Sequence, residues 1–534
     1  MARCRALLFF VLLLGTAVAH AQENRYMVFF RDKAGTAFST AQPAAFLSQR
    51  SLARRAKNGV GVSEADLPVV RSYVEQVSAT GAPVFYTTRW LNGVLVQTTP
   101  ALAAQIGTLP FVSRVEQVAP GGRLPSGRTK KIKNKTDSGI APETLGQLSM
   151  LGMDAMHTEA VRGEGVLIAV FDSGYQGVDT AGPFAHLWSD QRISYTFDFV
   201  GNGAEVFRYD DHGTEVFSVI SARSGTYTGG APGAAFHLYV TEDVRSEYRI
   251  EEYNWLFAAE RADSAGVDII QSSLGYNTFD DAAMDYAKED LDGQTAIVSQ
   301  AAALALARGM VVVASAGNEG NNSWQLVTPP ADVDGVLAVG SVTANFTKSS
   351  FSSVGPTADG RLKPDVVALG SGTQVVRPNG TNGFSSGTSL AAPLVTSLAA
   401  GLLQRFPQLT VAQLYEAITA TASQANQPNQ LLGFGIPNYQ RIVSYLSPEA
   451  PDEEITIYPN PVSGEPVHVL LKTVQQPVTV TVHEWQGRVL QEESMFVSWQ
   501  NNPLSIDLSN LPAGMYLLVV RAGAHSRTER IIKQ

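Results

Sequence analysis

The chain has 534 residues, of which 44% are hydrophobic and 16% are charged, and its net charge is −10. This composition fits a folded protein and excludes a disordered one, and the length predicts about three parts rather than one ordinary domain. Residues 22–135 hold sixteen basic and six acidic side chains, whereas the chain beyond residue 135 holds twenty-one basic and forty-three acidic ones. These opposite charges predict attraction between the two parts. Nucleic-acid binding by the basic part is disfavoured, because it carries no known nucleic-acid motif.

Residues 1–21 have the pattern of a secretory signal peptide. Arg3 and Arg5 precede an apolar run at residues 7–14, and Ala19-His20-Ala21 resembles a small-residue cleavage site. The run is too short for a membrane anchor, which takes about 20 residues. Cys4 is the only cysteine of the chain. We therefore expect an exported protein with no disulfide and no cysteine metal site.

Residues 22–135 are predicted to form a small α+β domain. Their patterns favour strands at residues 26–30, 84–86 and 94–96 and mostly helical structure at residues 41–58. The basic, polar stretch at residues 125–138 has little means of burying itself, so it is a suitable site for proteolytic nicking.

Residues 136–446 show an α/β pattern. Apolar runs typical of buried parallel strands alternate with helical stretches, and this alternation predicts a parallel sheet with helices on both faces. The strands are expected at residues 166–171, 236–240, 267–270, 310–313 and 336–339, and the helices at residues 251–265, 295–308 and 391–404. Ligands bind at the carboxyl ends of the strands in such folds, and Asp172 lies at one of those ends.

The last part of the chain is predicted to be all β. A polar, proline-containing linker at residues 447–454 precedes residues 455–534, where strands at 467–471, 478–482 and 515–520 indicate a small β-sandwich. A carbohydrate-binding or other accessory sandwich is the alternative reading of this part.

Ser389 is the candidate nucleophile. Gly387 allows close backbone approach before it, and Ala391 and Ala392 are expected to begin a helix after it, so Ser389 would lie at a helix N-terminus that favours an anion. A serine hydroxyl needs a base to take its proton. A plain N-cap role would suit Ser386 and Thr388 equally well.

His212 is the candidate base. It begins a predicted helix, and Gly213 is interpreted as leaving room beside the ring for a substrate or nucleophile. Asp172 would hold the imidazole tautomer and stabilise the imidazolium. Asp210 and Asp211 are rivals for that role, but they adjoin His212 in sequence and cannot easily reach its ring nitrogen.

Two further segments fit the same chemistry. Asn318 would supply a side-chain amide to an oxyanion, although Gly-Asn sequences also favour plain turns. Ser273, Leu274 and Gly275 follow a predicted strand and are expected to pair with a substrate backbone and line its side-chain pocket. Glu242, after another strand, is a weaker hypothesis for selecting basic substrate residues.

These segments resemble those of the subtilisin-like serine proteases. The likeness covers roughly residues 145–446 and rests on Asp172-Ser173-Gly174, His212-Gly213-Thr214, Gly317-Asn318-Glu319-Gly320 and Gly387-Thr388-Ser389. It implies peptide-bond hydrolysis by an endopeptidase through an acyl-enzyme on Ser389. His212 disfavours the related sedolisins, which use a glutamate base. The resemblance implies no cofactor for the chemistry, and the structural calcium common in the family cannot be matched to particular residues.

The parts of the chain before and after this region resemble segments that accompany such enzymes in one polypeptide. Residues 22–135 are similar in position and size to the family's inhibitory propeptide, with cleavage expected between Ser126 and Ile140. Residues 455–534 resemble the sorting domain of the type IX secretion system, on Tyr458-Pro459-Asn460-Pro461, residues 511–518 and the terminal Arg530-Ile531-Ile532-Lys533. These likenesses imply protein or peptide substrates, the chain's own propeptide as inhibitor, the secretion machinery as partner, and release or surface attachment beyond the outer membrane.

Two other classes compete with this interpretation. A non-catalytic surface adhesin would have little reason to keep the set of Asp172, His212, Asn318 and Ser389 intact. A serine esterase of the α/β-hydrolase type has the serine first in chain order, whereas here it comes last.

Overall fold

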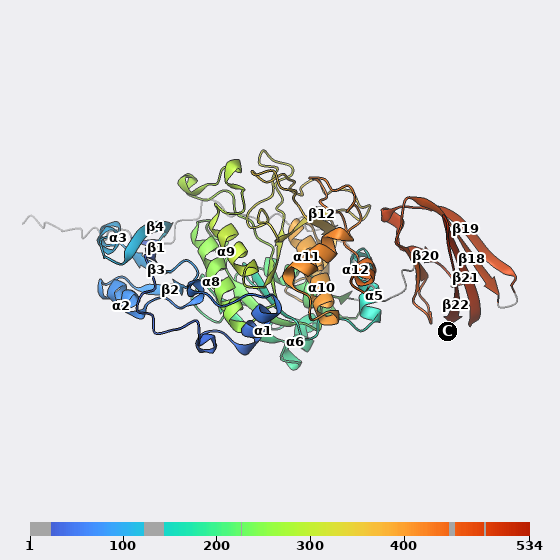
Figure 1. Ribbon diagram of the computed structural model, residues 1–534, viewed down its shortest axis with the longest axis horizontal. Coiled ribbons are helices and arrows are strands. Elements are labelled where there is room, and N and C mark those ends of the chain that lie inside the picture. Colours follow the sequence, from blue (N-terminus) through green and yellow to red (C-terminus); the bar gives the residue numbers. More distant parts are fainter. Residues whose placement is uncertain (1–22, 122–143, 226, 448–453, 485–486) are drawn as a thin grey trace, which may run out of the picture.

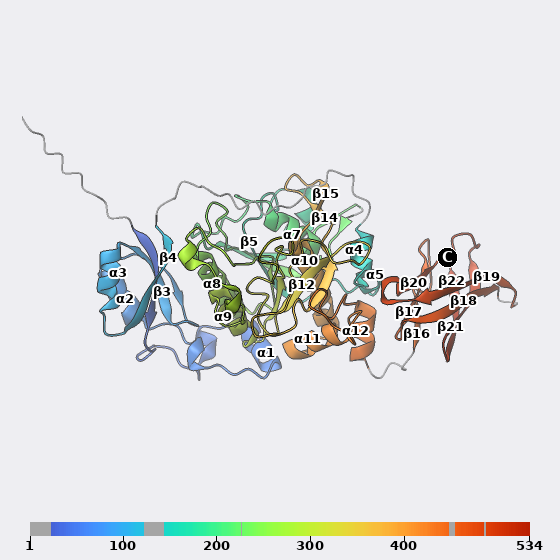
Figure 2. The same cartoon turned by 90° about the horizontal axis from the view of Figure 1, so that it is seen from above.

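The structure is a computed structural model that describes residues 23–121, 144–225, 227–447, 454–484 and 487–534. The predicted signal peptide, the basic stretch at residues 125–138 and most of the predicted linker lie outside these ranges. Figures 1 and 2 show three bodies in chain order, with the N-terminal and C-terminal domains at opposite ends of a larger central domain.

The N-terminal domain is a four-stranded antiparallel sheet, in the order β2-β3-β1-β4, covered by helices. Alternation along its first strand gives the sheet two apolar faces: Val28 packs in the domain's own core, whereas Met27 and Phe29 pack against the central domain. The helical prediction for residues 41–58 corresponds to a short 3₁₀ turn and one helix. The elements are β1 (Asn24–Phe30), α1 (Gln49–Lys57), α2 (Arg71–Ala79), β2 (Val84–Thr88), β3 (Gly93–Thr98), α3 (Pro100–Gly107) and β4 (Val112–Pro120), with 3₁₀ turns at Pro43–Ala45 and Glu64–Asp66.

The central domain is built on a seven-stranded parallel sheet, in the order β13-β12-β11-β10-β5-β9-β6. All five predicted strands are present, and the sequence reading missed the two edge strands. The strands are β5 (Leu167–Asp172), β6 (Ile193–Asp198), β9 (Ala235–Val240), β10 (Ile269–Ser272), β11 (Val311–Ser315), β12 (Leu337–Val342) and β13 (Val366–Leu369). Short two-stranded ribbons pair β7 (Arg223–Ser224) with β8 (Tyr227–Thr228), and β14 (Thr373–Val376) with β15 (Asn382–Ser385).

Helices cover both faces of this sheet, as the alternation of strand and helix predicts. Along β5, Ile168 and Val170 face the core that contains α7 and α10, whereas Ala169 and Phe171 face the core that contains α8 and α9. The helices are α4 (Leu145–Ser149), α5 (Met153–Thr158), α6 (Ala185–Ser189), α7 (His212–Ser221), α8 (Ile250–Ala265), α9 (Ile297–Leu306), α10 (Thr388–Arg405), α11 (Val411–Ala420) and α12 (Tyr439–Leu446), with 3₁₀ turns at Gly182–Phe184, Ala282–Met284 and Lys288–Asp290.

The C-terminal domain consists of two antiparallel sheets, in the orders β16-β17-β20 and β19-β18-β21-β22. Alternate residues such as Val467 and Val469 from one sheet and Val478 and Val480 from the other share one apolar core. The elements are β16 (Ile455–Tyr458), β17 (Val467–Leu471), β18 (Gln476–Glu484), β19 (Val489–Val497), β20 (Leu504–Ile506), β21 (Gly514–Ala522) and β22 (His525–Lys533), with a 3₁₀ turn at Trp499–Asn501. No helix within the described ranges is long and apolar enough to cross a membrane.

Candidate active site

Asp172 and His212 meet at the carboxyl edge of the central sheet. Asp172 is the last residue of β5, and His212 is the first residue of α7. The Nδ1 atom of His212 lies 2.8 Å from Oδ1 of Asp172, and both side chains are buried. The same Oδ1 accepts the backbone N–H of Ser173 at 2.8 Å and lies 3.1 Å from the hydroxyl oxygen of that residue. These contacts all fall on one oxygen of the carboxylate, and Oδ2 is buried without a hydrogen-bond partner among the described residues.

Gly213 allows α7 to approach the end of β5 this closely. A Cβ atom at Gly213 would lie 2.3 Å from the carbonyl oxygen of Gly174 and 2.9 Å from Cβ of Asp172. The interpretation that Gly213 leaves room for a substrate is therefore wrong, because β5 and its following turn already occupy that space.

The pKa of His212 reflects burial, which lowers it, and neighbouring carboxylates, which raise it. Burial has the largest single effect and acts to lower the pKa of the imidazole, but the charge and hydrogen bond of Asp172 oppose it. Asp210 and Asp211 act in the same direction as Asp172, so the pKa of His212 lies above its ordinary value. Asp210 accepts the hydroxyl of Ser173 at 2.6 Å, and no hydrogen bond of the described residues joins Asp210 to the imidazole of His212. Sequence reasoning did not identify this link from Asp210 through Ser173 to Asp172.

Ser389 lies in the first turn of α10. The helix begins at Thr388, three residues before its predicted start. Pro393 lies four residues after Ser389 and has no N–H, so the carbonyl of Ser389 lacks its usual helical donor. The hydroxyl of Ser273 donates to that carbonyl at 2.7 Å. In return, Oγ of Ser389 donates to the carbonyl of Ser273 at 3.3 Å.

The base and the nucleophile are not hydrogen-bonded in this state. Nε2 of His212 is buried and has no hydrogen-bond partner in the described structure, while the hydroxyl of Ser389 is directed to Ser273. The helices that carry the two residues, α7 and α10, pack against each other. Catalytic hydrogen bonds are often absent or long before a substrate is bound.

Asn318 follows β11 and faces the start of α10. Its Oδ1 accepts the backbone N–H of Thr388 at 2.9 Å and the hydroxyl of the same residue at 3.0 Å. The backbone N–H can only donate, so this contact fixes which end of the amide is the carbonyl. The side-chain N–H₂ group donates to no other described group, and the residue is exposed. A donor is thus available at a helix N-terminus.

The predicted substrate segment follows β10 and lies beside Ser389. Ser273 and Leu274 are buried, and a Cβ atom at Gly275 would lie 2.1 Å from Oγ1 of Thr328. Glu242 accepts the hydroxyl of Tyr276, the residue after Gly275, at 2.5 Å. This contact places Glu242 close to the segment, and its influence on substrate choice stays a prediction.

The described residues contain no group of three or more His, Cys, Asp or Glu side chains suited to holding a metal ion. Structural calcium therefore stays an expectation that nothing in these parts of the chain tests.

Three family profiles match successive parts of the chain. Residues 25–136 match the peptidase S8 propeptide domain of Bacteroidota, and residues 456–534 match a secretion system C-terminal sorting domain. Residues 163–435, half of the chain, match the subtilase family. The chain belongs to the subtilase family. The predicted subtilisin-like fold is thereby confirmed, and the sorting domain indicates export across the outer membrane.

This subtilase is similar to several bacterial proteases. It is 32% identical over 283 residues to subtilisin of Bacillus pumilus, a match that covers 52% of the chain and 90% of that protein. It is also 32% identical over 283 residues to subtilisin NAT of Bacillus subtilis subsp. natto and to subtilisin E of Bacillus subtilis (strain 168). Each of these matches covers 52% of the chain and 65% of the relative, so the chain spans a little under two thirds of their length.

Proposed function

We propose that this subtilase is a secreted serine endopeptidase that hydrolyses peptide bonds through an acyl-enzyme on Ser389. The observation that carries the proposal is the buried 2.8 Å contact between His212 and Asp172, beside the helix that holds Ser389 in its first turn. A buried carboxylate on Nδ1 leaves Nε2 of the neutral ring as the proton acceptor.

The reaction has two steps, acylation and deacylation, and His212 accepts and then returns a proton in each. Nε2 of His212 takes the proton of Ser389 as Oγ attacks the carbonyl carbon, and the imidazolium then protonates the leaving nitrogen as the C–N bond breaks. Water then attacks the ester carbon and gives a proton to His212, and the imidazolium returns this proton to Oγ as the C–Oγ bond breaks and the acid is released. Asp172 stays ionised throughout and stabilises the imidazolium.

The oxyanion of each tetrahedral intermediate is stabilised by Asn318 and by the start of α10. The side-chain amide of Asn318 donates to the oxyanion, and the N-terminal N–H groups of the helix favour the same negative charge. Because Oδ1 already accepts the N–H of Thr388, the amide nitrogen is the end of the side chain that is left to donate to the oxyanion.

Substrate binding accompanies a change at Ser389. Oγ must leave the carbonyl of Ser273 and turn toward Nε2 of His212, a rotation between staggered rotamers of a small side chain. Ser273, Leu274 and Gly275 then pair with the backbone of an extended substrate. The proposed chemistry uses groups of the protein and water and requires no cofactor.

We also propose the division of the chain that the sequence predicts. It comprises a signal peptide at residues 1–21, an inhibitory propeptide at 22–135, a catalytic domain at 136–446, a linker at 447–454 and a sorting domain at 455–534. Its partners are protein or peptide substrates, its own propeptide and the secretion machinery. The positions of the three family matches support this division.

Hydrolysis of an internally quenched peptide library by the mature protein tests the activity. Ser389→Ala should lower kcat by roughly 10⁶-fold, the magnitude known for the nucleophile of subtilisin. Ser386→Ala is the matched control, because Ser386 lies three residues before Ser389 and its hydroxyl accepts the N–H of Gly372, just before β14. Wild-type rates in Ser389→Ala, or no hydrolysis by the wild type after propeptide removal, would contradict the proposal.

A further inference from the structure

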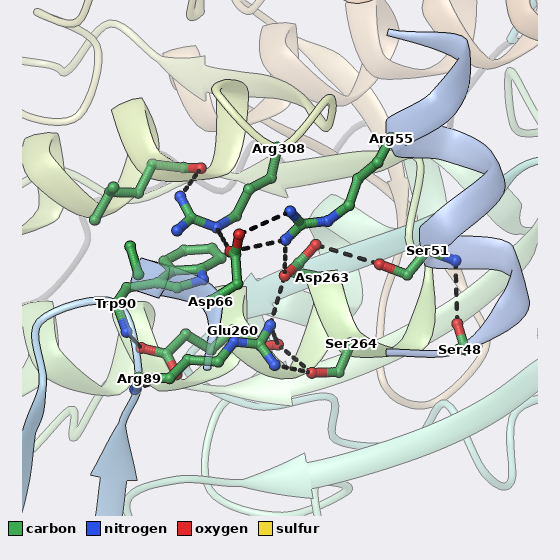
Figure 3. A network of polar contacts seen from close by, with 12 residues as sticks. Ser48, Ser51, Arg55, Asp66, Arg89, Trp90, Glu260, Asp263, Ser264 and Arg308 are labelled. Atoms are coloured by element: carbon green, nitrogen blue, oxygen red, sulfur yellow. Dashed lines mark hydrogen bonds and ion pairs between the residues drawn. The ribbon is translucent and has the colours of Figure 1, made fainter. Parts of the chain in front are cut away.

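A buried cluster of charge lies between the N-terminal domain and the base of the catalytic domain (Figure 3). Its centre is Asp263, near the end of α8, and the chain turns there into β10. This is the amino edge of the parallel sheet, whereas Asp172 and Ser389 lie at the carboxyl edge. The cluster is therefore separate from the proposed active site.

Three arginines of the N-terminal domain converge on the carboxylate of Asp263. Arg54 and Arg55 come from α1, and Arg89 follows β2; all three form ion pairs with Asp263, that of Arg55 at 2.8 Å. Figure 3 shows Arg55 and Arg89 reaching the carboxylate from different sides. The side chain of Asp263 is completely buried. A carboxylate at this depth is stable only when it is paired and hydrogen-bonded.

The remaining charges of the cluster are paired across the same interface. Asp66 of the N-terminal domain binds Arg308 of the catalytic domain at 2.7 Å, and the guanidinium of Arg308 lies 4.4 Å from the ring of Trp90. Glu260 accepts the backbone N–H groups of Arg89 and Trp90, at 3.0 and 3.1 Å. Separation of the two domains would therefore leave several charges without their partners.

The helix α1 also fits the backbone of the catalytic domain closely. Arg54 donates to the carbonyl of Val267 at 2.7 Å, and Asn58 accepts the N–H of Val411, the first residue of α11, at 2.8 Å. A Cβ atom on Gly266 would lie 2.6 Å from Cβ of Arg50, and one on Gly309 would lie 2.7 Å from Asn58. Because these two glycines have no side chain, α1 can pack directly against the backbone of the catalytic domain.

The helix lies apart from the sheet that forms the rest of the N-terminal domain. Both general views place α1 beside the catalytic domain, with β1 to β4 at the end of the molecule (Figures 1 and 2). The sheet binds α8 through an apolar face that includes Met27 and Phe29, whereas α1 binds through arginines. The N-terminal domain thus contacts the catalytic domain through two chemically different elements.

We propose that the base of the catalytic domain is a guanidinium-binding site for the α1 arm (residues 43–66), and that this site, rather than the apolar face of the sheet alone, sets how slowly the propeptide dissociates once its covalent link has been cut. The proposal rests on the proposed function, because that function supplies the cut. Arginine suits the site better than lysine, since its planar group donates to Asp263 and to the carbonyls around it at once. The pairs are buried, so salt should weaken the attachment little.

The experiment uses the full-length Ser389→Ala chain with a recognition sequence for a site-specific protease inserted within residues 122–143. After the cut, the dissociation rate of the N-terminal domain is measured on protein immobilised by its C-terminal domain, at about 0.1 M and about 1 M salt. Because this chain has no nucleophile, the result is independent of whether the proposed catalysis is correct.

Arg54→Ala combined with Arg55→Ala should accelerate dissociation at least about 100-fold, because it leaves Asp263 buried without two of its partners. Arg71→Ala is the matched control, since Arg71 is exposed and pairs within α2. If the double variant does not fold, Arg50→Ala with Asn58→Ala removes contacts at the rim of the site and should accelerate dissociation about tenfold. Dissociation of the folded arm variants at the parent's rate, or a rate for the parent that rises steeply with salt, would overturn the proposal.

Discussion

At the scale of single residues, the candidate site combines motif residues with contacts that only folding creates. The motifs predict Asp172, His212, Asn318 and Ser389 because their residue types, order and flanking glycines are readable along the chain. The exchange of hydrogen bonds between Ser273 and Ser389 is not readable in this way. It depends on the carbonyl of Ser389, which Pro393 leaves without a helical donor. It also depends on the packing of α10 beside the end of β10.

Replacing Asp172 should change both the rate and its pH dependence. If the neutral imidazole is the base, as proposed, kcat/KM should rise with pH through the pKa of His212, which Asp172 holds above the ordinary value of about 6.5. Asp172→Asn should move this limb to lower pH and reduce kcat by about 10⁴-fold. Rate profiles over pH check this, and Asp211→Asn should move the limb less, because Asp211 has the smaller effect on the pKa of His212. An unmoved limb in Asp172→Asn would mean that another group titrates.

Replacing Asn318 should reduce stabilisation of the transition state without weakening substrate binding. Asn318→Ala is expected to reduce kcat by about 10²- to 10³-fold with little change in KM, a magnitude taken from the equivalent donor of subtilisin. Asn321→Ala is the control, because Asn321 is an exposed asparagine of the same loop that donates to Ser350. An effect confined to KM in steady-state kinetics would assign Asn318 to ground-state binding instead.

At the scale of helices and strands, apolar runs of the chain identify the five inner strands of the central sheet, because both faces of those strands are buried. The edge strand β6 has half-buried residues such as Tyr195 and Thr196, so its pattern is weaker. The other edge strand, β13, is fully buried, but a run of four apolar residues does not by itself indicate a strand. The sequence predicts a late start for α10 because Thr388 and Ser389 are equally compatible with positions before a helix.

The contact between α8 and α9 contains a carboxylic acid that should affect stability. Glu252 accepts the hydroxyl of Tyr286 at 2.9 Å and the N–H of Val298 at 3.1 Å. Burial, the largest influence, raises the pKa of Glu252 to about 7 from an unperturbed value of 4.5, although these hydrogen bonds oppose it. The folded state therefore favours the neutral acid.

The raised pKa of Glu252 predicts that the free energy of unfolding falls as the pH rises. The contribution of Glu252 is complete below about pH 4.5 and is lost as the pH rises to about 7, a loss of roughly 3 kcal/mol. Glu252→Gln should remove that part of the pH dependence, measured by chemical unfolding of the Ser389→Ala chain at several pH values. Glu75→Gln, at an exposed position on α2, should leave it unchanged. Parallel pH profiles for the Ser389→Ala chain with and without Glu252→Gln would contradict this role of Glu252.

At the scale of the whole molecule, charge distribution predicted that the N-terminal part would be attracted to the rest. It could not predict that the attraction would be concentrated at Asp263, because Arg54, Arg55 and Arg89 are brought together only by the fold. Nor could it predict that one face of the N-terminal sheet would join the core formed around α8 and α9. The order of the three parts is predicted from sequence, whereas the contacts between them follow from packing.

Covalent labelling shows whether Ser389 is an activated nucleophile. The mature protein is treated with a fluorophosphonate and digested, and the modified peptide is identified by mass spectrometry. A single adduct on Ser389 is expected, lost in His212→Ala and retained in Ser386→Ala. An adduct on another residue, or no adduct on protein shown to have lost its propeptide, would mean that Ser389 is not the nucleophile.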